Sequence, residues 1–295
     1  MLPEAIAALA CPHDGTALEL RGRTLGCEHG HRFDLARQGY ATLIARPLAH
    51  HGDAAVMVER RQRVHAARVL GAIHDAVADA AGAPSPYDRP PATSGADGLV
   101  CDVGAGPGTY LAAVLDRLPE RTGLAIDVSK AAARRAARCH PRASAIVADV
   151  WGGLPLRTGS VALLLDVFAP RNASEFARVV VEGGRLVVVT PDADHLAELR
   201  SAVGMLDVPS GKAEQVAHEL ERGFRLVTTT QVRERVRVPG ELAVDLARMG
   251  PSGHHLDPAA PSAPATGPGP RAGAEGAITV TLAATVSRFE RTDPA

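Results

Sequence analysis

Short apolar runs alternate with helix-like segments along the second two-thirds of this 295-residue chain. The runs are rich in Val, Leu and Ala and are bounded by turn residues, a pattern that predicts buried strands. We expect strands near residues 98–103, 123–127, 144–148, 160–167, 184–190, 224–238 and 277–289, with a helix near 240–249. Strands that alternate with helices predict a doubly wound α/β fold, so the first five strands should be parallel.

The turn after the first run has a composition suited to ligand binding. The apolar residues 99–103 are followed by Gly104, Gly106 and Gly108, and then by a helix-like segment. Glycine adopts backbone conformations that other residues avoid, and it lets a nucleotide-like ligand approach the main chain. The second run ends at Asp127, where a carboxylate can accept hydrogen bonds from ribose hydroxyls. A purely structural strand-to-helix turn is the alternative.

The spacing of these residues resembles the first motif of class I S-adenosylmethionine-dependent methyltransferases, D-x-G-x-G-x-G. Asp102 supplies the acid of this motif, and Asp127 matches the ribose-binding acid of the class. Asp149, which follows another apolar run, resembles the acid that lies beside the adenine. The long runs at 224–238 and 277–289 resemble the antiparallel closing pair of the class. The resemblance implies a Rossmann-like, mostly parallel sheet with an antiparallel closing strand, and S-adenosyl-L-methionine as the methyl donor.

The composition limits what the chain can bind. The net charge is -1, so any nucleic-acid surface must be local. Nearly all basic residues are Arg in an Ala-rich chain, which indicates compositional bias and weakens Arg abundance as a signal for nucleic acid. The sequence has no apolar run long enough to cross a membrane. We therefore expect a cytoplasmic protein with reduced cysteines and no membrane partner.

Residues 1–38 are predicted to form a small zinc-ribbon-like module. A segment of this size has little core and needs a staple. The predicted metal ligands, in two turns that flank a hairpin, are Cys11, Asp14, Cys27 and His31. Asp14 stands where a ribbon of the C-x-x-C type places its second cysteine. His13 and His29 are the other local candidates, and a metal-free module is the alternative.

Three further segments follow. Residues 39–81 form a basic connecting segment with a helical stretch from about Ala54 to Ala81, suited to phosphate contact or simply to a solvated helix face. Residues 82–97 read as a Pro/Gly-rich linker, and residues 98–295 as the methyltransferase domain. Within that domain, a Pro/Ala/Gly run near 258–276 is expected to be a mobile loop.

Several motifs together resemble the RlmA-type 23S rRNA guanine-N1 methyltransferases, over nearly the whole chain except its two linkers. The N-terminal matches are Cys11-Pro12, Cys27, Gly30-His31, Phe33-Asp34, Arg37-Gln38-Gly39-Tyr40, Gly52-Asp53, Met57 and Arg61. The later matches are Asp127-Val128-Ser129-Lys130, Ala169-Pro170-Arg171-Asn172, Gly183-Gly184, Thr190-Pro191, His195-Leu196, Met249-Gly250-Pro251-Ser252 and Asp257-Pro258. The chain is most similar to the branch that includes the macrolide (tylosin) resistance enzymes of antibiotic-producing actinomycetes.

The resemblance implies methylation of N1 of a guanine in a domain II hairpin loop of 23S rRNA. It places Gly106, Pro107 and His195 in the donor site, to which the reading of the residues adds Gly104, Gly108, Asp127 and Asp149. Asp166, at the tip of the fourth strand, is the candidate acceptor for the proton of guanine N1. An exposed helix-start role for His195 and a loop-starting role for Asp166 are the alternatives.

Three positions depart from the family pattern. Asp14 replaces a zinc-binding cysteine, Leu70 replaces a tyrosine that contacts the donor, and His254 replaces a usual tryptophan. These changes put in doubt the metal, the lid of the donor pocket and the stacking of the target base, respectively.

Two other functions compete with rRNA methylation. A methyltransferase of a small natural product would leave the ribbon without a use, and a catalytically silent protein would bind RNA without methyl transfer. No feature points to DNA. The sequence leaves open a homodimer, and it leaves open whether methylation serves housekeeping or macrolide resistance.

Overall fold

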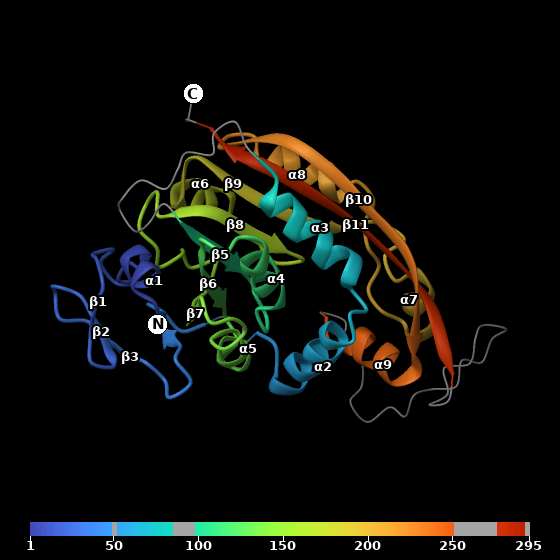
Figure 1. Cartoon of the computed structure of the whole chain (residues 1–295), viewed down its shortest axis with the longest axis horizontal. Coiled ribbons are helices and arrows are strands. Elements are labelled where there is room, and N and C mark those ends of the chain that lie inside the picture. Colours follow the sequence, from blue (N-terminus) through green and yellow to red (C-terminus); the bar gives the residue numbers. More distant parts are fainter. Residues whose placement is uncertain (49–51, 85–97, 251–275, 293–295) are drawn as a thin grey trace.

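The computed structural model describes residues 1–48, 52–84, 98–250 and 276–292 (Figure 1). Its centre is an eight-stranded sheet. Along the sheet the strands are β10 (Phe224–Pro239), β11 (Ala277–Arg291), β9 (Val180–Pro191), β8 (Val161–Val167), β5 (Leu99–Val103), β6 (Thr122–Asp127), β7 (Ala143–Val147) and β4 (Ala41–Thr42). All seven predicted strands are present.

The strand directions confirm the predicted topology. Strands β9, β8, β5, β6 and β7 pair parallel to one another. Strand β11 pairs antiparallel with β9, and β10 pairs antiparallel with β11. The short strand β4 adds to the far edge, where Ala41 pairs with Ile146. Two residues carry no periodicity, so this strand could not be predicted from the pattern.

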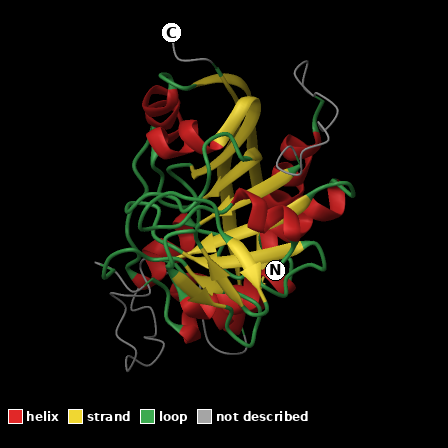
Figure 2. Ribbon diagram, turned by 90° about the vertical axis from the view of Figure 1, so that its left-hand side faces the viewer, coloured by secondary structure: helices red, strands yellow, loops and turns green. Residues whose placement is uncertain are grey.

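Helices cover both faces of the sheet (Figures 1 and 2). One apolar cluster holds residues of α3 (Gly71–Gly82), α4 (Thr109–Arg117), α5 (Lys130–Ala136) and α9 (Gly240–Arg248). The other holds residues of α1 (Pro3–Ala8), α6 (Ala173–Val179) and α8 (Lys212–Leu220). Neighbouring residues of β5 alternate between the two clusters, Val100 in the first and Leu99 and Cys101 in the second. This explains why the central runs are apolar throughout.

The expected helical stretch at 54–81 is divided in two. Helix α2 (Ala55–Ala66) ends before Arg68, whose φ is 54°, and α3 then begins at Gly71. The two helices therefore take different directions, and α2 packs on α9 while α3 packs on α4. Helix α7 (Ala197–Val203) follows β9 and packs on β11.

The N-terminal segment forms a separate antiparallel sheet of three strands, β1 (Glu19–Arg21), β2 (Thr24–Gly26) and β3 (Arg32–Asp34). It lies at one end of the molecule, drawn in blue in Figure 1. Helix α1 and the ribbon residue Leu25 share the apolar cluster of the main sheet. In the described part of the chain, no helix is long and apolar enough to span a lipid bilayer.

Some expectations fall outside the described residues. The greater part of the predicted linker at 82–97, the expected mobile loop near 258–276 except Gly276, and His254 are among them.

Candidate functional site

A cavity of about 460 Å³ opens at the carboxyl ends of β5, β8 and β9. Ligands of open α/β sheets bind at this edge, close to the place where the strand order reverses. Four of the predicted donor-site residues line the cavity, namely Gly104, Gly106, Pro107 and His195. Leu70, which departs from the family's tyrosine, also lies in the wall.

Glycine is required at Gly104 because of a close approach. The residue has a φ of 70°, and a Cβ atom there would lie 2.5 Å from the Cβ of Ala169. Gly108, with a φ of 84°, is the residue before α4, where a Cβ would lie 2.7 Å from Cys139 Sγ. Gly108 is not among the residues that line the cavity. The first glycine thus lets the loop after β8 pack on the turn, and the last lets α4 pack on the end of α5.

Asp127 shapes the glycine turn. Its Oδ2 accepts a hydrogen bond from Gly106 N at 2.8 Å, and its Oδ1 accepts one from Ser129 N at 2.8 Å. Burial raises the pKa of Asp127, and the two N–H donors oppose that rise. Each carboxylate oxygen keeps a second lone pair for a further hydrogen bond, although Asp127 is not among the residues that line the cavity.

Asp102 is a buried acid without a partner. It is 1% exposed, it lines the cavity, and neither of its oxygens has a hydrogen-bond partner among the described residues. Burial and the negative charges of Asp127 and Asp166 raise its pKa well above the usual range. A cation in the cavity would offset this cost. S-adenosylmethionine carries an ammonium and a sulfonium group, so the residues present fit this cofactor.

His195 presents a defined hydrogen-bond donor. Its Nδ1 accepts a hydrogen bond from Ala283 N at 3.2 Å, and burial lowers its pKa to about 4. The neutral ring must therefore carry its proton on Nε2. This placement disfavours the alternative of an ordinary exposed residue at a helix start.

Asp166 lies behind the cavity wall rather than in it. It is completely buried, and its Oδ2 accepts a hydrogen bond from Arg171 Nε at 2.8 Å. Its Oδ1 has no partner among the described residues. Burial raises its pKa to about 7, against the opposing charge of Arg171. Arg171 itself lines the cavity.

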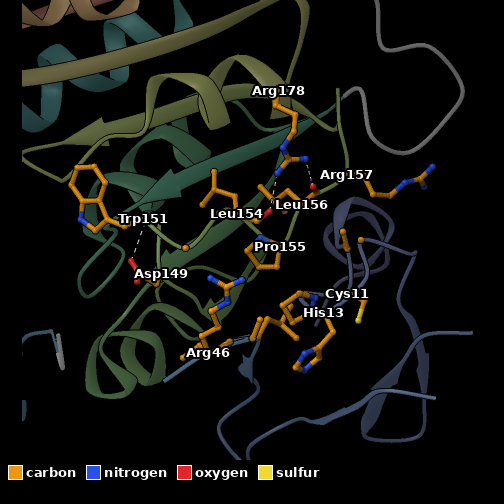
Figure 3. A pocket seen from close by; sticks show the side chains of 18 of the residues that line it. Cys11, His13, Arg46, Asp149, Trp151, Leu154, Pro155, Leu156, Arg157 and Arg178 are labelled. Carbon is orange, nitrogen blue, oxygen red and sulfur yellow. Dashed lines mark hydrogen bonds between the residues drawn. The ribbon is translucent and has the colours of Figure 1, made fainter. Parts of the chain in front are cut away.

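Asp149 lies in a different hollow from the other predicted donor residues. This second hollow, of about 1030 Å³, lies between the ribbon turn at Cys11 and the loop that follows β7 (Figure 3). Asp149 Oδ1 accepts a hydrogen bond from Trp151 N at 3.0 Å, and the Trp151 side chain is largely exposed. Arg46 lines the same hollow and points toward the loop that carries Asp149 (Figure 3).

The structure brings the four predicted metal ligands together. Atoms of Cys11, Asp14, Cys27 and His31 that can bind a metal all lie within 4.8 Å of one another. His31 Nδ1 lies 2.9 Å from Asp14 Oδ2 and 3.4 Å from Cys27 Sγ. Two sulfurs, one imidazole nitrogen and one carboxylate oxygen suit tetrahedral zinc. His29, 3.1 Å from the same Asp14 oxygen, is a neighbour of this cluster.

Sequence reasoning missed the role of Arg61 over the glycine turn. Its guanidinium forms an ion pair with Asp53 at 2.7 Å and donates to Met249 O at 2.6 Å. A Cβ on Gly106 would lie 3.1 Å from Arg61 Nη1. Arg61 therefore ties together α2, the segment before it and the end of α9. The motif contained Arg61, but nothing in the local pattern identifies a partner as distant as Met249.

A buried histidine pair beside the cavity was also missed. His65 Nδ1 lies 2.8 Å from His74 Nε2, and the ring of Tyr110 packs edge-on against both. Burial lowers the pKa of His65 to about 3 and that of His74 to about 4, so both rings are neutral. Because the two helices are separate, their spacing in sequence gave no sign of this contact.

The sheet order, the glycine turn and the cavity define a class I S-adenosylmethionine-dependent methyltransferase preceded by a zinc ribbon. The zinc-ribbon family model described as "RlmA, N-terminal" matches residues 9–50. The 23S rRNA (guanine(748)-N(1))-methyltransferase of Streptomyces fradiae is 42% identical over 258 residues, covering 88% of this chain and 90% of the relative. The chain belongs to the RlmA-type 23S rRNA guanine-N1-methyltransferase family.

Two further similarities were found. A relative from Micromonospora griseorubida is 44% identical over 268 residues, which cover 88% of this chain and 91% of the relative. Its provisional name is 23S rRNA (guanine-N(1)-)-methyltransferase. Among solved structures, the YcgJ protein of Bacillus subtilis is 16% identical, with a TM-score of 0.45 over 67% of this chain and 93% of that one.

Proposed function

We propose that this protein transfers a methyl group from S-adenosylmethionine to N1 of a guanine in a domain II hairpin loop of 23S rRNA, in the cytoplasm. The observation that carries the proposal is the near full-length similarity to the Streptomyces fradiae enzyme, whose name states that reaction at guanine 748. Macrolide resistance enters the proposal only through the resemblance of the sequence to the branch that includes the tylosin-resistance enzymes.

The cavity residues have separate tasks in this proposal. When bound, S-adenosylmethionine supplies a methyl group on a positively charged sulfur. Asp102 offsets the positive charge of the donor, and Asp127 holds the glycine turn in shape and faces the ribose. Gly104, Gly106 and Pro107 allow close approach of the main chain, and His195 donates from Nε2. Since the sulfonium is a reactive group by itself, most of the rate comes from orientation.

The reaction also needs an acceptor for a proton. As the new C–N bond forms at guanine N1, the N–H bond at that nitrogen breaks. Asp166 remains our candidate acceptor, because its Oδ1 has no hydrogen-bond partner in the described part of the chain and burial raises its pKa to about 7. Water or a main-chain shift must connect it to the cavity, since the side chain is fully buried.

We assign RNA recognition to the zinc-ribbon module of residues 1–38 and to the hollow beside it. Four of the five arginines of the basic segment at 39–81 form ion pairs with acids, which favours a structural role for them: Arg60, Arg61, Arg63 and Arg68. Arg46, in contrast, has no acid partner among the described residues and lines the hollow with Trp151. A guanidinium can contact phosphate, and an exposed indole can stack on a loop base.

The test is methyl transfer from labelled S-adenosylmethionine to unmethylated 23S rRNA, with the base mapped by primer extension. N1 methylation blocks Watson–Crick pairing, so reverse transcriptase should stop in the domain II hairpin. Arg46→Ala should weaken RNA binding but leave donor binding intact. Donor binding without transfer to RNA would contradict the proposal. Transfer to a small molecule, or RNA binding alone, would then support one of the two competing functions.

A further inference from the structure

Phe168 has an unusual backbone conformation at the edge of the donor cavity. Its φ is 54°, in the left-handed region that non-glycine residues rarely adopt. Among the described non-glycine residues, the others with positive φ are Arg68 and Leu196. Phe168 and Leu196 both line the cavity. Strained residues persist where the surrounding structure holds them, and they gather at functional sites.

Three contacts hold the loop of Phe168 in place. Phe168 N donates a hydrogen bond to Val189 O at 3.2 Å. The next residue, Ala169, packs against Gly104 so closely that no side chain fits there. The buried ion pair of Asp166 and Arg171 then ties the far end of the loop to β8. The packing of the loop therefore imposes the left-handed conformation, which is not the intrinsic preference of a phenylalanine.

The result of this strain is an aromatic ring that is not buried. Phe168 is 38% exposed, although Phe is normally a core residue. It lines the cavity, and its ring centroid lies 5.6 Å from that of His195, at an angle of 36°. The fixed ring thus offers an aromatic surface to whatever enters the cavity.

The position of the ring favours the target base over the donor's nucleoside. Phe168 follows β8 and Asp127 ends β6, with β5 between these strands. Neighbouring strands are about 4.8 Å apart, so the two residues stand roughly 10 Å apart across the glycine turn. Asp127 faces the donor's ribose in the proposed function. The Phe168 ring is then on the side of the reacting end.

We propose that Phe168 is the platform on which the target purine of the RNA stacks during methyl transfer. This inference rests on the proposed function. A loop base that leaves its RNA neighbours loses stacking, and a fixed aromatic ring replaces that contact. The ring positions the base and takes no part in proton transfer. Its rigid placement aligns N1 with the methyl group.

The experiment compares binding of two labelled RNA hairpins, one with the target guanine and one abasic at that position, in the presence of S-adenosylhomocysteine. Stacking on an aromatic side chain is worth about 1–3 kcal/mol, so wild type should prefer the guanine hairpin roughly 5–150-fold. Phe168→Ala should lose most of this preference, Phe168→Leu should recover little, and Phe168→Tyr should retain it. Donor affinity should change less than about twofold in all three.

A stability comparison and a control variant separate the role of the ring from effects on folding. Phe168→Gly should unfold at a higher temperature than Phe168→Ala, the reverse of the usual order, because glycine relieves the left-handed strain. The control is Leu226→Ala on β10, since Leu226 is similarly exposed at 42% and should leave binding unchanged.

The remaining outcomes overturn the inference. If Phe168→Ala keeps the preference for guanine, the ring is no platform for the base. If donor affinity falls by the same factor as RNA affinity, the ring belongs to the donor site. Methylation of the hairpin by the wild-type protein would uphold the proposed function even if either of these results overturns the role of Phe168. Wild-type protein that does not methylate it overturns both.

Discussion

The carboxylate of Asp127 accepts a hydrogen bond at 2.8 Å from the backbone N–H of Gly106, 21 residues earlier in the chain. A second bond from Ser129 N fixes the other oxygen. The residue that sequence reasoning assigns to the ribose therefore also closes the glycine turn. Its removal should affect both the shape of the turn and the contact with the donor.

Asp127→Ala should weaken donor binding by about 10–100-fold and lower the free energy of unfolding by about 1–3 kcal/mol, since charge-assisted hydrogen bonds are lost. Asp127→Asn keeps one oxygen as an acceptor, so its donor affinity and stability should lie between those of wild type and Asp127→Ala. Titration calorimetry with S-adenosylmethionine and chemical denaturation measure these effects. Unchanged donor affinity in the alanine variant would contradict the ribose assignment.

Asp102→Asn should change stability and binding in opposite directions. The wild-type fold must either bury this carboxylate or protonate it, because burial raises the pKa of Asp102. Both cost free energy and asparagine avoids both, so we expect the variant to be more stable than wild type by about 1–3 kcal/mol. Donor binding should fall about 10–100-fold, because the negative charge that offsets the cationic donor is gone. Urea unfolding measures the gain in stability, and titration calorimetry on the same preparation measures the loss of donor affinity. A more stable variant with full donor affinity would remove Asp102 from the donor site.

How far the sequence predicted this molecule depends on the range of the interactions. Strands such as 98–103 and ligand spacings such as Cys27 to His31 are local patterns, so they were predicted close to where the structure has them. The hydrogen bond of Arg61 to Met249 O joins groups 188 residues apart, and the contact of His65 with His74 depends on how the chain turns at Arg68. No local pattern encodes such geometry.

Asp149 and Phe168 illustrate the same limit at the site. Asp149 ends an apolar run, the pattern that predicts a donor-site acid, and in the structure it lines the hollow beside the ribbon and not the cavity that His195 lines. Phe168 looks like a core residue, and only its φ and exposure single it out. Backbone strain is set by the packed loop and leaves no signature in the residue types.

Asp14→Cys should strengthen zinc binding. The change gives the ribbon three thiolates and one imidazole, the donor set that structural zinc sites favour. Competition with a chromophoric chelator should show an affinity for zinc higher by about tenfold or more, and Asp14→Ala should bind zinc more weakly than wild type. If both variants equal wild type, the fourth ligand is not Asp14, and His13→Ala and His29→Ala become the informative substitutions.

His74→Gln should reduce the loss of stability in acid. The folded state lowers the pKa of His74 from 6.5 to about 4, so below pH 6.5 the unfolded chain takes up a proton that the folded chain does not. Stability is therefore lost as pH falls from about 7 toward 4. Between pH 7.5 and 5 this one site costs wild type about 2 kcal/mol. Glutamine can keep the hydrogen bond to His65 and does not titrate. Over the same pH range the free energy of unfolding of the variant should therefore fall by about 2 kcal/mol less than that of wild type. If the free energies of unfolding of variant and wild type fall equally with pH, His74 is protonated or solvated in the folded state.

Asp166→Asn should separate proton transfer from loop support. Asparagine keeps an oxygen for Arg171, so the loop and donor affinity should persist. Burial raises the pKa of Asp166 to about 7, so the carboxylate that can accept a proton dominates only above that pH. Wild-type kcat should therefore rise with pH and level off above about 7. In the variant kcat should be roughly 100-fold lower at pH 8, and this acid limb should be absent. Single-turnover methylation of the RNA hairpin across pH 5.5–9 measures both. A variant that retains the wild-type rate and the same acid limb would restrict Asp166 to holding the Phe168 loop, and the acceptor for the guanine proton would then have to be a group that lines the cavity.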